Sequence, residues 1–463
     1  MYYSKHQFDD TIVALATPAG VGAIAVIRLS GKDALRIADL FFYGKKLSRQ
    51  ASHTAHFGTI RADNQQIIDE VLATVFVAPR SYTRENTVEI STHGSPYIVQ
   101  QVIQLAIRHG ARMAQPGEFT LRAFLNGQLD LSQAEAVADL IASSSESAHQ
   151  LAIQQMRGGF SLKIKELRTQ LVNFASLMEL ELDFGEEDVE FANRSDLKVL
   201  ILKIQKIIRN LSDSFALGNV LKNGVLTVIA GRPNAGKSTL LNALLNEERA
   251  IVSEIAGTTR DTIEEILNIN GIAFRLVDTA GIRQATDAIE AIGVQKTLEK
   301  VRQSAVLLYV FDILETTIEA VKTDLASLRQ HDMKILVICN KQDSNELFKI
   351  DDLAKTIQVD KIIALSAKYG THLKDLKSTL YELVAAGQVK SDSTIVSNAR
   401  HYEALQKSDE CLSAVLNSMA IGVTTDFVAM DLRMALYHLG SITGTVTTDD
   451  LLENIFRNFC IGK

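Results

Sequence analysis

Residues 225–245 read VLTVIAGRPNAGKSTLLNALL, and this stretch decides the fold of the chain. The apolar, β-branched VLTVIA predicts a strand, and the periodic leucines of TLLNALL predict a helix after the turn. The turn matches G-x-x-x-x-G-K-[ST], with Gly231, Gly236, Lys237 and Ser238 at the fixed positions. In such a loop the backbone N–H groups and the helix start face a phosphate, the lysine reaches the outer phosphates, and the hydroxyl binds Mg²⁺. The stretch therefore predicts a nucleotide-phosphate site inside an α/β domain.

Three later motifs predict that the nucleotide is GTP, and each follows an apolar run typical of a strand. In the first motif, D-x-x-G, Asp278 is expected to hold Mg²⁺ through water and the Gly281 amide to contact the γ-phosphate. The second, NKQD at 340–343, ends in Asp343, whose carboxylate can accept two hydrogen bonds from the N1 and N2 groups of guanine. The third, SAK at 366–368, is expected to close over the base. Four motifs in this order predict a GTP site.

The segment between the phosphate loop and the D-x-x-G motif predicts a switch loop. It reads SEIAGTTRD at 253–261, and we expect Thr259, rather than Thr258, to ligate Mg²⁺ when GTP is bound. The residue after the D-x-x-G motif is Ile282, at the position where Ras-like GTPases carry the glutamine that orients the attacking water. Isoleucine cannot orient water, so another group must do so. Two carboxylates of the same region are candidates, although either also reads as an ordinary surface charge: Asp287 and Glu290.

The region before the phosphate loop predicts two further parts. Residues 11–29 predict two strands around a Pro-Ala-Gly turn, 69–77 and 87–91 predict strands, and 96–109 predicts a helix, which together indicate an α+β module. On composition alone, three of its polar residues read as ordinary surface or hydrogen-bonded groups: Arg28, Glu89 and His93.

From about residue 129 to 221 the pattern is helical. Ser132 and Glu135 have the spacing of a capping box and predict the first helix start. Apolar residues at steps of three and four predict a buried helix face: Leu167, Leu171, Phe174, Met178 and Leu182. An acidic cluster leaves two interpretations, a metal site or the more common solvated loop: Glu186, Glu187, Asp188 and Glu190.

The alternation of strands and helices from 223 to 384 predicts a doubly wound sheet, and a helical pattern returns after it. One later helix carries Val428, Leu432, Ala435 and Leu439; a last one, capped by Thr447 and Asp450, carries Leu452, Ile455, Phe456 and Phe459. Residues 385–463 are few for an independent core, and domain termini often lie close together. We therefore predict four parts: an α+β module (1–126), a helical domain (127–222), an inserted Ras-like P-loop G domain (223–384), and the second part of the helical domain (385–463).

Composition predicts a soluble cytoplasmic protein. The chain has 463 residues, a net charge of −7 and three cysteines, too few and too scattered for a disulfide framework or a zinc site. No apolar run reaches the roughly 18 residues of a membrane span, and MYYSKHQFDD is no signal peptide. The acidic balance gives no global electrostatic footprint for nucleic acid, so any RNA contact is expected from a local patch or a partner.

The motifs along the whole chain resemble those of the tRNA-modification GTPase MnmE (TrmE) family. The resemblance rests on TPAGVGAIAVIRLSG at 17–31, PGEFTLRAFLNGQLDLSQAEAVADLI at 116–141, GRPNAGKS, IAGTTRD, DTAGIR, NKQD and the final FCIGK. It implies a potassium-stimulated GTPase, activated by dimerisation of its G domains. It further implies that a flavin-dependent partner, MnmG, joins it in a heterotetramer, with FAD only on the partner. The pair would add an aminomethyl or carboxymethylaminomethyl group to C5 of the wobble uridine (position 34) of certain tRNAs, which bind mostly through the complex.

The resemblance also implies the roles of residues at the GTP site. Lys237 and Glu290 would be catalytic, Glu290 by orienting water, with Mg²⁺ on Ser238 and Thr259. Potassium would be held by Asn234, Ser253, Ile255 and Thr258, where the family commonly has threonine at position 253; serine keeps the hydroxyl. The full set of implied GTP contacts is Asn234, Ala235, Gly236, Lys237, Ser238, Thr239, Ser253, Glu254, Ile255, Ala256, Gly257, Thr258, Thr259, Asp278, Thr279, Ala280, Gly281, Asn340, Lys341, Asp343, Ser366, Ala367 and Lys368.

The N-terminal domain, by the same resemblance, forms the homodimer and binds the one-carbon donor, 5-formyl- or methylene-tetrahydrofolate. The implied folate contacts are Arg28, Glu89, Gln128 and Lys463. The family usually has lysine at position 128, so glutamine keeps a hydrogen bond but loses a charge directed at the anionic tail of folate. For Cys460 two roles stay open, catalysis and positioning, because a nucleophilic thiolate needs a lowered pKa that no sequence pattern reveals. A prenylation box is rejected, because the last four residues are CIGK and no polybasic stretch precedes them.

Two rival functions are distinguishable on the same residues. A GTP-dependent ribosome-assembly switch would share the G motifs but add an RNA-binding domain with a basic face, which this sequence lacks, and would not end in FCIGK. A folate-dependent transferase with a vestigial G domain is disfavoured because every G motif is intact.

Overall fold

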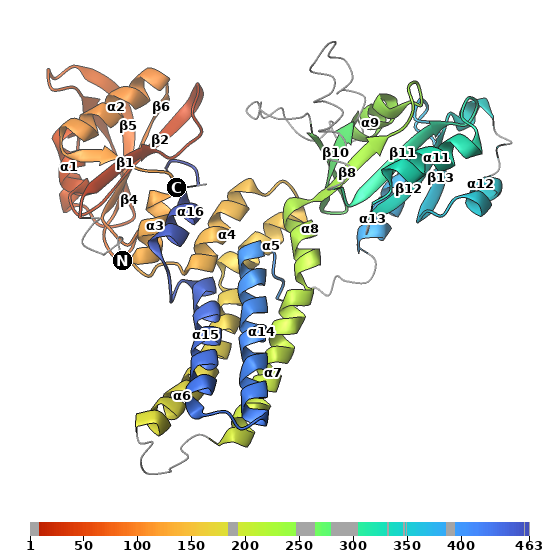
Figure 1. Cartoon of the computed structure of the whole chain (residues 1–463). Helices are drawn as coiled ribbons and strands as arrows, with labels where there is room; N and C mark the ends of the chain where they lie inside the picture. The colour runs from red at the N-terminus through yellow and green to blue at the C-terminus, as the bar shows by residue number, and fades with distance from the viewer. Residues whose placement is uncertain are drawn as a thin grey trace, which may run out of the picture. The chain divides into compact units, whose positions relative to one another are not determined.

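The computed structural model describes residues 9–183, 193–246, 264–278, 304–330, 333–345, 348, 350–385, 394–457 and 459–462. The chain divides into two compact units, the second inserted in the sequence of the first (Figure 1). The first unit comprises Met1–Ile141, Ile153–Ser212 and Arg400–Lys463, and the second comprises Ala142–Ala152 and Asp213–Ala399. The four-part division at residues 126, 222 and 384 stays a prediction.

The N-terminal part of the first unit is built on a seven-stranded sheet of order β3-β4-β5-β6-β2-β1-β7. Neighbouring strands are antiparallel except β1 and β7. The strands are β1 (Thr11–Leu15), β2 (Gly22–Ser30), β3 (Phe42–Tyr43), β4 (Thr54–Arg61), β5 (Ile67–Phe76), β6 (Thr87–Gly94) and β7 (Ala111–Met113). Helices α1 (Ala34–Phe41) and α2 (Pro96–Arg108) contribute apolar side chains to one core with the sheet. The predicted α+β class is confirmed, and sequence patterns missed β3, β4, β7 and α1.

Helices form the rest of the first unit. Their bounds are α3 (Glu118–Leu125), α4 (Leu131–Ala142), α6 (Gly159–Asp183), α7 (Arg194–Asp213), α14 (Ala399–Ala420), α15 (Thr425–Thr443) and α16 (Asp449–Phe456). Helix α15 packs along α6 (Figure 1). On α6, Leu167, Leu171 and Met178 are buried, as predicted, while Phe174 and Leu182 are half-buried. The four apolar residues predicted to share one helix face, Val428, Leu432, Ala435 and Leu439, are buried on α15. The acidic cluster at 186–190 lies outside the described residues.

Two predicted helix caps were wrong by one or two residues. Helix α4 begins at Leu131, so Asp130 precedes it: the Asp130 carboxylate accepts from the Gln133 N–H at 3.1 Å, and the Gln133 side chain accepts from the Asp130 N–H at 2.9 Å. This is the reciprocal capping box that was predicted for Ser132 and Glu135. At α16 the cap is Thr448, whose hydroxyl accepts from the Leu451 N–H, instead of Thr447.

The second unit is a doubly wound α/β domain, as predicted. Its sheet has the order β13-β12-β11-β8-β10-β9, parallel except for the edge strand β9. The elements are α8 (Phe215–Asn223), β8 (Val225–Ala230), α9 (Lys237–Asn246), β9 (Glu264–Ile269), β10 (Ile272–Asp278), β11 (Val306–Asp312), α11 (Ile318–Leu328), β12 (Lys334–Asn340), α12 (Ile350–Thr356), β13 (Lys361–Ala364) and α13 (Leu373–Ala385), and helix α5 (Glu146–Met156) begins in this unit. One hydrophobic core joins the sheet to α9 and α13, and a second joins it to α11 and α12. Within the described residues of both units, no helix is long and apolar enough to cross a membrane.

Candidate functional site

The predicted phosphate loop connects β8 to α9, and its close contacts require glycine at two positions. Gly231 has φ +152°, and a Cβ there would lie 1.9 Å from the Val310 carbonyl oxygen on β11. Gly236 has φ +94°, and a Cβ there would lie 2.1 Å from the Asn340 side-chain nitrogen. The loop is therefore pressed against β11 and β12, at the edge of the sheet where the parallel strands end.

The loop also surrounds the ammonium group of Lys237. Lys237 is largely buried, and its Nζ donates to the carbonyl oxygens of Gly231 and Arg232 at 3.0 and 2.9 Å. This places a positive charge inside the loop, beside the N-terminus of α9, where the helix dipole also favours an anion. The arrangement suits a phosphate group.

Two oxygen donors meet at the start of α9. The Ser238 hydroxyl donates to the Asp278 carboxylate at 2.8 Å, so the last residue of β10 lies beside the first turn of the helix. Hydroxyl and carboxylate oxygens are the ligands that Mg²⁺ prefers. The donor set fits the magnesium site predicted from the sequence, whose third expected residue, Thr259, lies outside the described residues.

Asn340 connects the phosphate loop to the base-binding turn. Its buried side chain donates to the Ala235 carbonyl oxygen at 2.8 Å and accepts from the Ala367 N–H at 3.0 Å. The first and last motifs of the predicted nucleotide site are therefore joined through one amide. Because both hydrogen bonds of the Asn340 side chain are buried, a substitution of Asn340 is expected to disturb both motifs.

The carboxylate expected to select guanine is held ready for hydrogen bonding. The Ser366 hydroxyl donates to Asp343 at 2.6 Å, and this bond lowers the pKa of the Asp343 carboxyl, with a further contribution from the charge of Lys368. Asp343 is exposed and can therefore accept from a base. Lys341, in the left-handed conformation with φ +67°, donates to Asp312 at 2.5 Å. The structure thus brings the NKQD and SAK motifs together.

Part of the predicted nucleotide site lies outside the described residues. This applies to Ser253, Glu254, Ile255, Ala256, Gly257, Thr258, Thr259, Thr279, Ala280, Gly281 and Glu290, and to Lys463 of the predicted folate set. Of the predicted potassium contacts, Asn234 is described, and it has φ +61° within the phosphate loop.

A second group of predicted residues meets in the first unit. Arg28 on β2 pairs with Glu89 on β6 at 2.7 Å, and its guanidinium lies 5.6 Å from the ring centres of both Tyr82 and Phe119. Arg28 also donates to the Gly462 carbonyl oxygen at 3.4 Å. Phe119 is fully buried and Tyr82 is half-buried, so the Arg28–Glu89 pair is the part of this group that can hydrogen-bond a ligand.

The two remaining predicted residues near this group have different surroundings. The Gln128 side-chain oxygen accepts a hydrogen bond from the Arg84 guanidinium at 2.9 Å. Cys460 is exposed, and its carbonyl oxygen accepts from the Gly117 N–H at 3.3 Å. The backbone of the C-terminal segment is therefore held against the N-terminus of α3.

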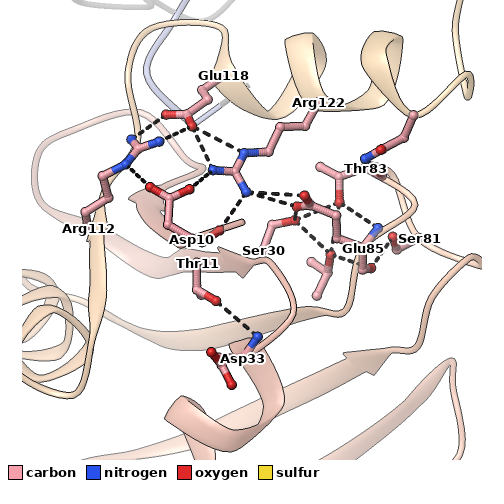
Figure 2. Close-up of polar contacts among 12 residues, drawn as sticks. Asp10, Thr11, Ser30, Asp33, Ser81, Thr83, Glu85, Arg112, Glu118 and Arg122 are labelled. Atoms are coloured by element: carbon pink, nitrogen blue, oxygen red, sulfur yellow. Dashed lines mark hydrogen bonds and ion pairs between the residues drawn. The ribbon is translucent and has the colours of Figure 1, made fainter. Parts of the chain in front are cut away.

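A polar network around the buried Arg122 was not predicted (Figure 2). Arg122 on α3, 1% exposed, donates to Asp10 at 2.6 Å, Glu118 at 2.9 Å and Glu85 at 3.2 Å, while Arg112 bonds Asp10 and Glu118 from β7. Burial would raise the pKa of Glu118, but the bonds from Arg112 and Arg122 outweigh it and lower that pKa; burial raises the pKa of Glu85. The sequence signal was the i,i+4 spacing of Glu118 and Arg122. The network fixes α3, which carries Phe119, to β7 and to the residues just before β1 and β6.

Comparisons with known proteins match this architecture. The chain matches the family described as GTP-binding protein TrmE N-terminus over residues 11–128 and the MnmE helical domain over residues 131–460. The tRNA modification GTPase MnmE of Cytophaga hutchinsonii is 54% identical over 455 residues, covering 98% of both chains. That of Flavobacterium psychrophilum is 54% identical, covering 98% of this chain and 100% of its own. Among solved structures, Aquifex aeolicus Era aligns at 26% identity over 40% of this chain and 66% of its own, with a TM-score of 0.29. The chain belongs to the tRNA modification GTPase MnmE family.

Proposed function

We propose that this chain is a GTP hydrolase that acts in the modification of tRNA. The observation that carries the proposal is the Asn340 amide, which joins the phosphate loop at Ala235 to the SAK turn at Ala367. A site that couples phosphate binding to base reading is what a guanine-nucleotide enzyme needs. Family membership, from relatives named tRNA modification GTPase MnmE, supports the substrate class.

For hydrolysis, we propose that Lys237 and the backbone N–H groups of the loop stabilise the charge that develops on the γ-phosphate. Ser238 and Thr259 would hold Mg²⁺, which neutralises phosphate charge when it is bound. Glu290 would orient the attacking water in place of the glutamine that Ile282 replaces. Potassium held by Asn234, Ser253, Ile255 and Thr258 would supply the positive charge that an arginine finger supplies in other GTPases.

For the modification itself, we propose an N-terminal site for a tetrahydrofolate one-carbon donor. Arg28 and Glu89 present a guanidinium and a carboxylate side by side, with the half-buried Tyr82 ring next to the guanidinium, and this set can hydrogen-bond the polar edge of a pteridine ring. Gln128 and Lys463 complete the proposed set, and the role of Cys460 stays open between catalysis and positioning.

The proposed reaction adds an aminomethyl or carboxymethylaminomethyl group to C5 of the wobble uridine in the cytoplasm. The chain would act as a homodimer in a heterotetramer with the flavoprotein MnmG, which carries FAD and contributes most of the tRNA contact. The rival, a GTP-dependent ribosome-assembly switch, would leave the tRNA unmodified.

The experiment is total-nucleoside analysis of tRNA from cells that lack this protein, with complementation by the wild-type gene. Loss of the modified wobble uridine, restored on complementation, is the expected result. Unchanged wobble uridines together with altered ribosomal subunit profiles would refute the proposal in favour of the assembly switch.

The potassium proposal has its own measurement. GTP turnover of the purified protein is compared in potassium and sodium buffers of equal ionic strength, so that screening is the same in both. Strong stimulation by potassium is expected. Equal turnover in both salts would refute the cation site around Asn234.

A further inference from the structure

Asp69 and His93 form a carboxylate–imidazole pair that neither the GTP site nor the Arg28 group uses. The His93 Nδ1 lies 2.7 Å from Asp69 Oδ1, and the His93 backbone N–H donates to Asp69 Oδ2 at 2.8 Å. The Glu70 N–H also donates to Asp69 Oδ1, at 2.9 Å. Three hydrogen bonds therefore fix this carboxylate, two of them to His93.

The position of the pair explains why its carboxylate is buried and its ring is not. The ladder between β5 and β6 ends at Leu72 opposite Ser91, so the backbone N–H of His93 has no strand partner on that side. The Asp69 side chain, 7% exposed, fills that place, while the His93 side chain is 71% exposed. The imidazole ring of His93 is therefore exposed to solvent, while the Asp69 carboxylate that holds it is buried and hydrogen-bonded.

This geometry selects one tautomer of the histidine. An ionised carboxylate accepts hydrogen bonds and cannot donate them, so the imidazole proton must lie on Nδ1. The Nε2 atom of the neutral ring then carries a free electron pair and faces outward. An oriented imidazole with a carboxylate on one nitrogen and an accessible lone pair on the other is the arrangement of a general base.

His93 lies on β6, the strand that also carries Glu89 of the proposed one-carbon site, and Asp69 lies on the neighbouring strand β5. Side chains alternate along β6, and Glu89, Ser91 and His93 share its less buried face. Four residues of strand put His93 roughly 13 Å from Glu89. The exposed Ile24 lies opposite His93 on β2, and Tyr97 at the start of α2 is exposed as well. Besides Asp69, the charged residues of these three strands are Arg28 on β2, Glu70 on β5 and Glu89 on β6.

We propose that Asp69 and His93 form a proton-transfer dyad for the one-carbon chemistry of the N-terminal part, an inference that rests on the proposed function. His93 Nε2 takes a proton from an amine or ammonium group of the bound substrate and returns it to the leaving group or to water. The N–H bond of the substrate breaks as the N–H bond at His93 Nε2 forms, so the step is a proton transfer without oxidation or reduction. Asp69 acts through His93, as the residue that positions the ring and stabilises its protonated form.

The test uses the full chain with its flavoprotein partner, tRNA, GTP, methylene-tetrahydrofolate and ammonium. The initial rate of modified-uridine formation is followed across the pH range in which an imidazole titrates. With wild-type protein the rate should rise with pH to a plateau, because the base form increases. His93→Gln should lower the plateau roughly 100-fold and remove the rise. Asp69→Asn should also lower the plateau but keep a rise with pH, because the His93 imidazole is still present. His56→Gln is the matched control, because His56 bonds the Thr54 hydroxyl and no carboxylate, and it should keep both.

Two further readouts separate catalysis from folding. Because the ring is exposed, added imidazole should restore a substantial part of the rate to His93→Ala, which a purely structural role does not predict. Nitrogen-15 NMR of the wild-type protein should show the neutral His93 ring protonated on Nδ1, and a ring protonated on Nε2 would overturn the proposal. Wild-type protein that forms no modified uridine would refute the proposed function, whereas active wild-type protein with an unaffected His93→Gln variant would refute the dyad alone.

Discussion

Replacing Glu135 by glutamine should destabilise the helical part of the first unit by about 3 kcal/mol at neutral pH. Glu135 on α4 accepts from Arg400 at 2.8 and 2.9 Å and from His401 at 2.7 Å, both on α14. Arg400 also donates to the carbonyl oxygens of Ser441 and Ile442, at the end of α15. The buried Glu135 carboxylate therefore neutralises the positive charges of Arg400 and His401 where α4, α14 and α15 are joined.

The magnitude follows from the pKa of that carboxyl. Burial by itself would raise the pKa of Glu135, but the charge of His401 and the bonds from His401 and Arg400 outweigh it and lower the pKa from 4.5 to about 2. A difference of roughly 2.5 units corresponds to about 3 kcal/mol. Removing one partner of a buried ion pair costs a similar 3–5 kcal/mol, roughly, in other proteins. Since the folded-state pKa is lowered, this stability is present above pH 4.5 and is lost as the pH falls toward 2.

The assay is urea unfolding followed by helical circular dichroism, at neutral pH and at several acidic values. Glu135→Gln should unfold at lower urea and show a weaker acid dependence below pH 4.5 than the wild type. Glu403→Gln is the matched control: Glu403 pairs with Lys407 on the same α14 but is exposed, so the variant should show no measurable loss. A loss for Glu135→Gln no larger than that of the control, or an unchanged acid dependence, would refute the reasoning.

Three predictions concern the GTP site. Asp343→Asn should shift the preference from guanosine toward xanthosine nucleotides, because the acceptor pair becomes partly a donor; competition binding checks this, and the wild-type preference for GTP would contradict the assignment. Gly236→Ala should weaken GTP binding by on the order of 100-fold, because its Cβ would displace the Asn340 amide 2.1 Å away at a cost of about 2–3 kcal/mol. Nucleotide titration measures this, with Asn242→Ala at an exposed position of α9 as the control, and near-normal affinity of Gly236→Ala would show that Asn340 is not fixed. Glu290→Ala should slow hydrolysis while GTP affinity stays nearly intact, since a water-orienting group acts mainly in the transition state; single-turnover kinetics and binding of a non-hydrolysable analogue separate the two effects, and unaltered turnover would remove Glu290 from the mechanism.

The helix caps show what a local pattern can miss by a small step. Asp130 and Ser132 can both cap a helix, and Thr447 and Thr448 are equally suitable by type. The choice is made by packing: Leu131 is fully buried and has to enter the helix, which leaves Asp130 as the residue before it. The capping residues in the sequence therefore predict that a helix starts in this region, but they do not predict which residue is its first.

Residues with bland sequence surroundings were the hardest to interpret. Arg28 and Glu89 read as ordinary polar residues, yet the β2–β6 register places them directly opposite each other. Arg122 and Glu118 have the spacing of a surface ion pair, yet both are buried, and Arg122 also pairs with Asp10 and Glu85. In each case the decisive neighbour comes from a distant part of the chain, and the pairing of strands decides which neighbour that is.

The two kinds of site in this chain differ in how much of their chemistry is contiguous. The phosphate loop binds through backbone groups and a lysine that turns back onto its own carbonyl oxygens, so its spacing alone predicts its structure. The Asp69–His93 pair joins residues of β5 and β6 that meet only where the ladder between those strands ends. A shift of the register by one residue would turn His93 to the opposite face of the sheet. A site such as the Asp69–His93 pair can therefore be identified only once the pairing of the strands is known. The end of the β5–β6 ladder, where a buried carboxylate orients an exposed imidazole, is the place in this protein to test for a further catalytic group.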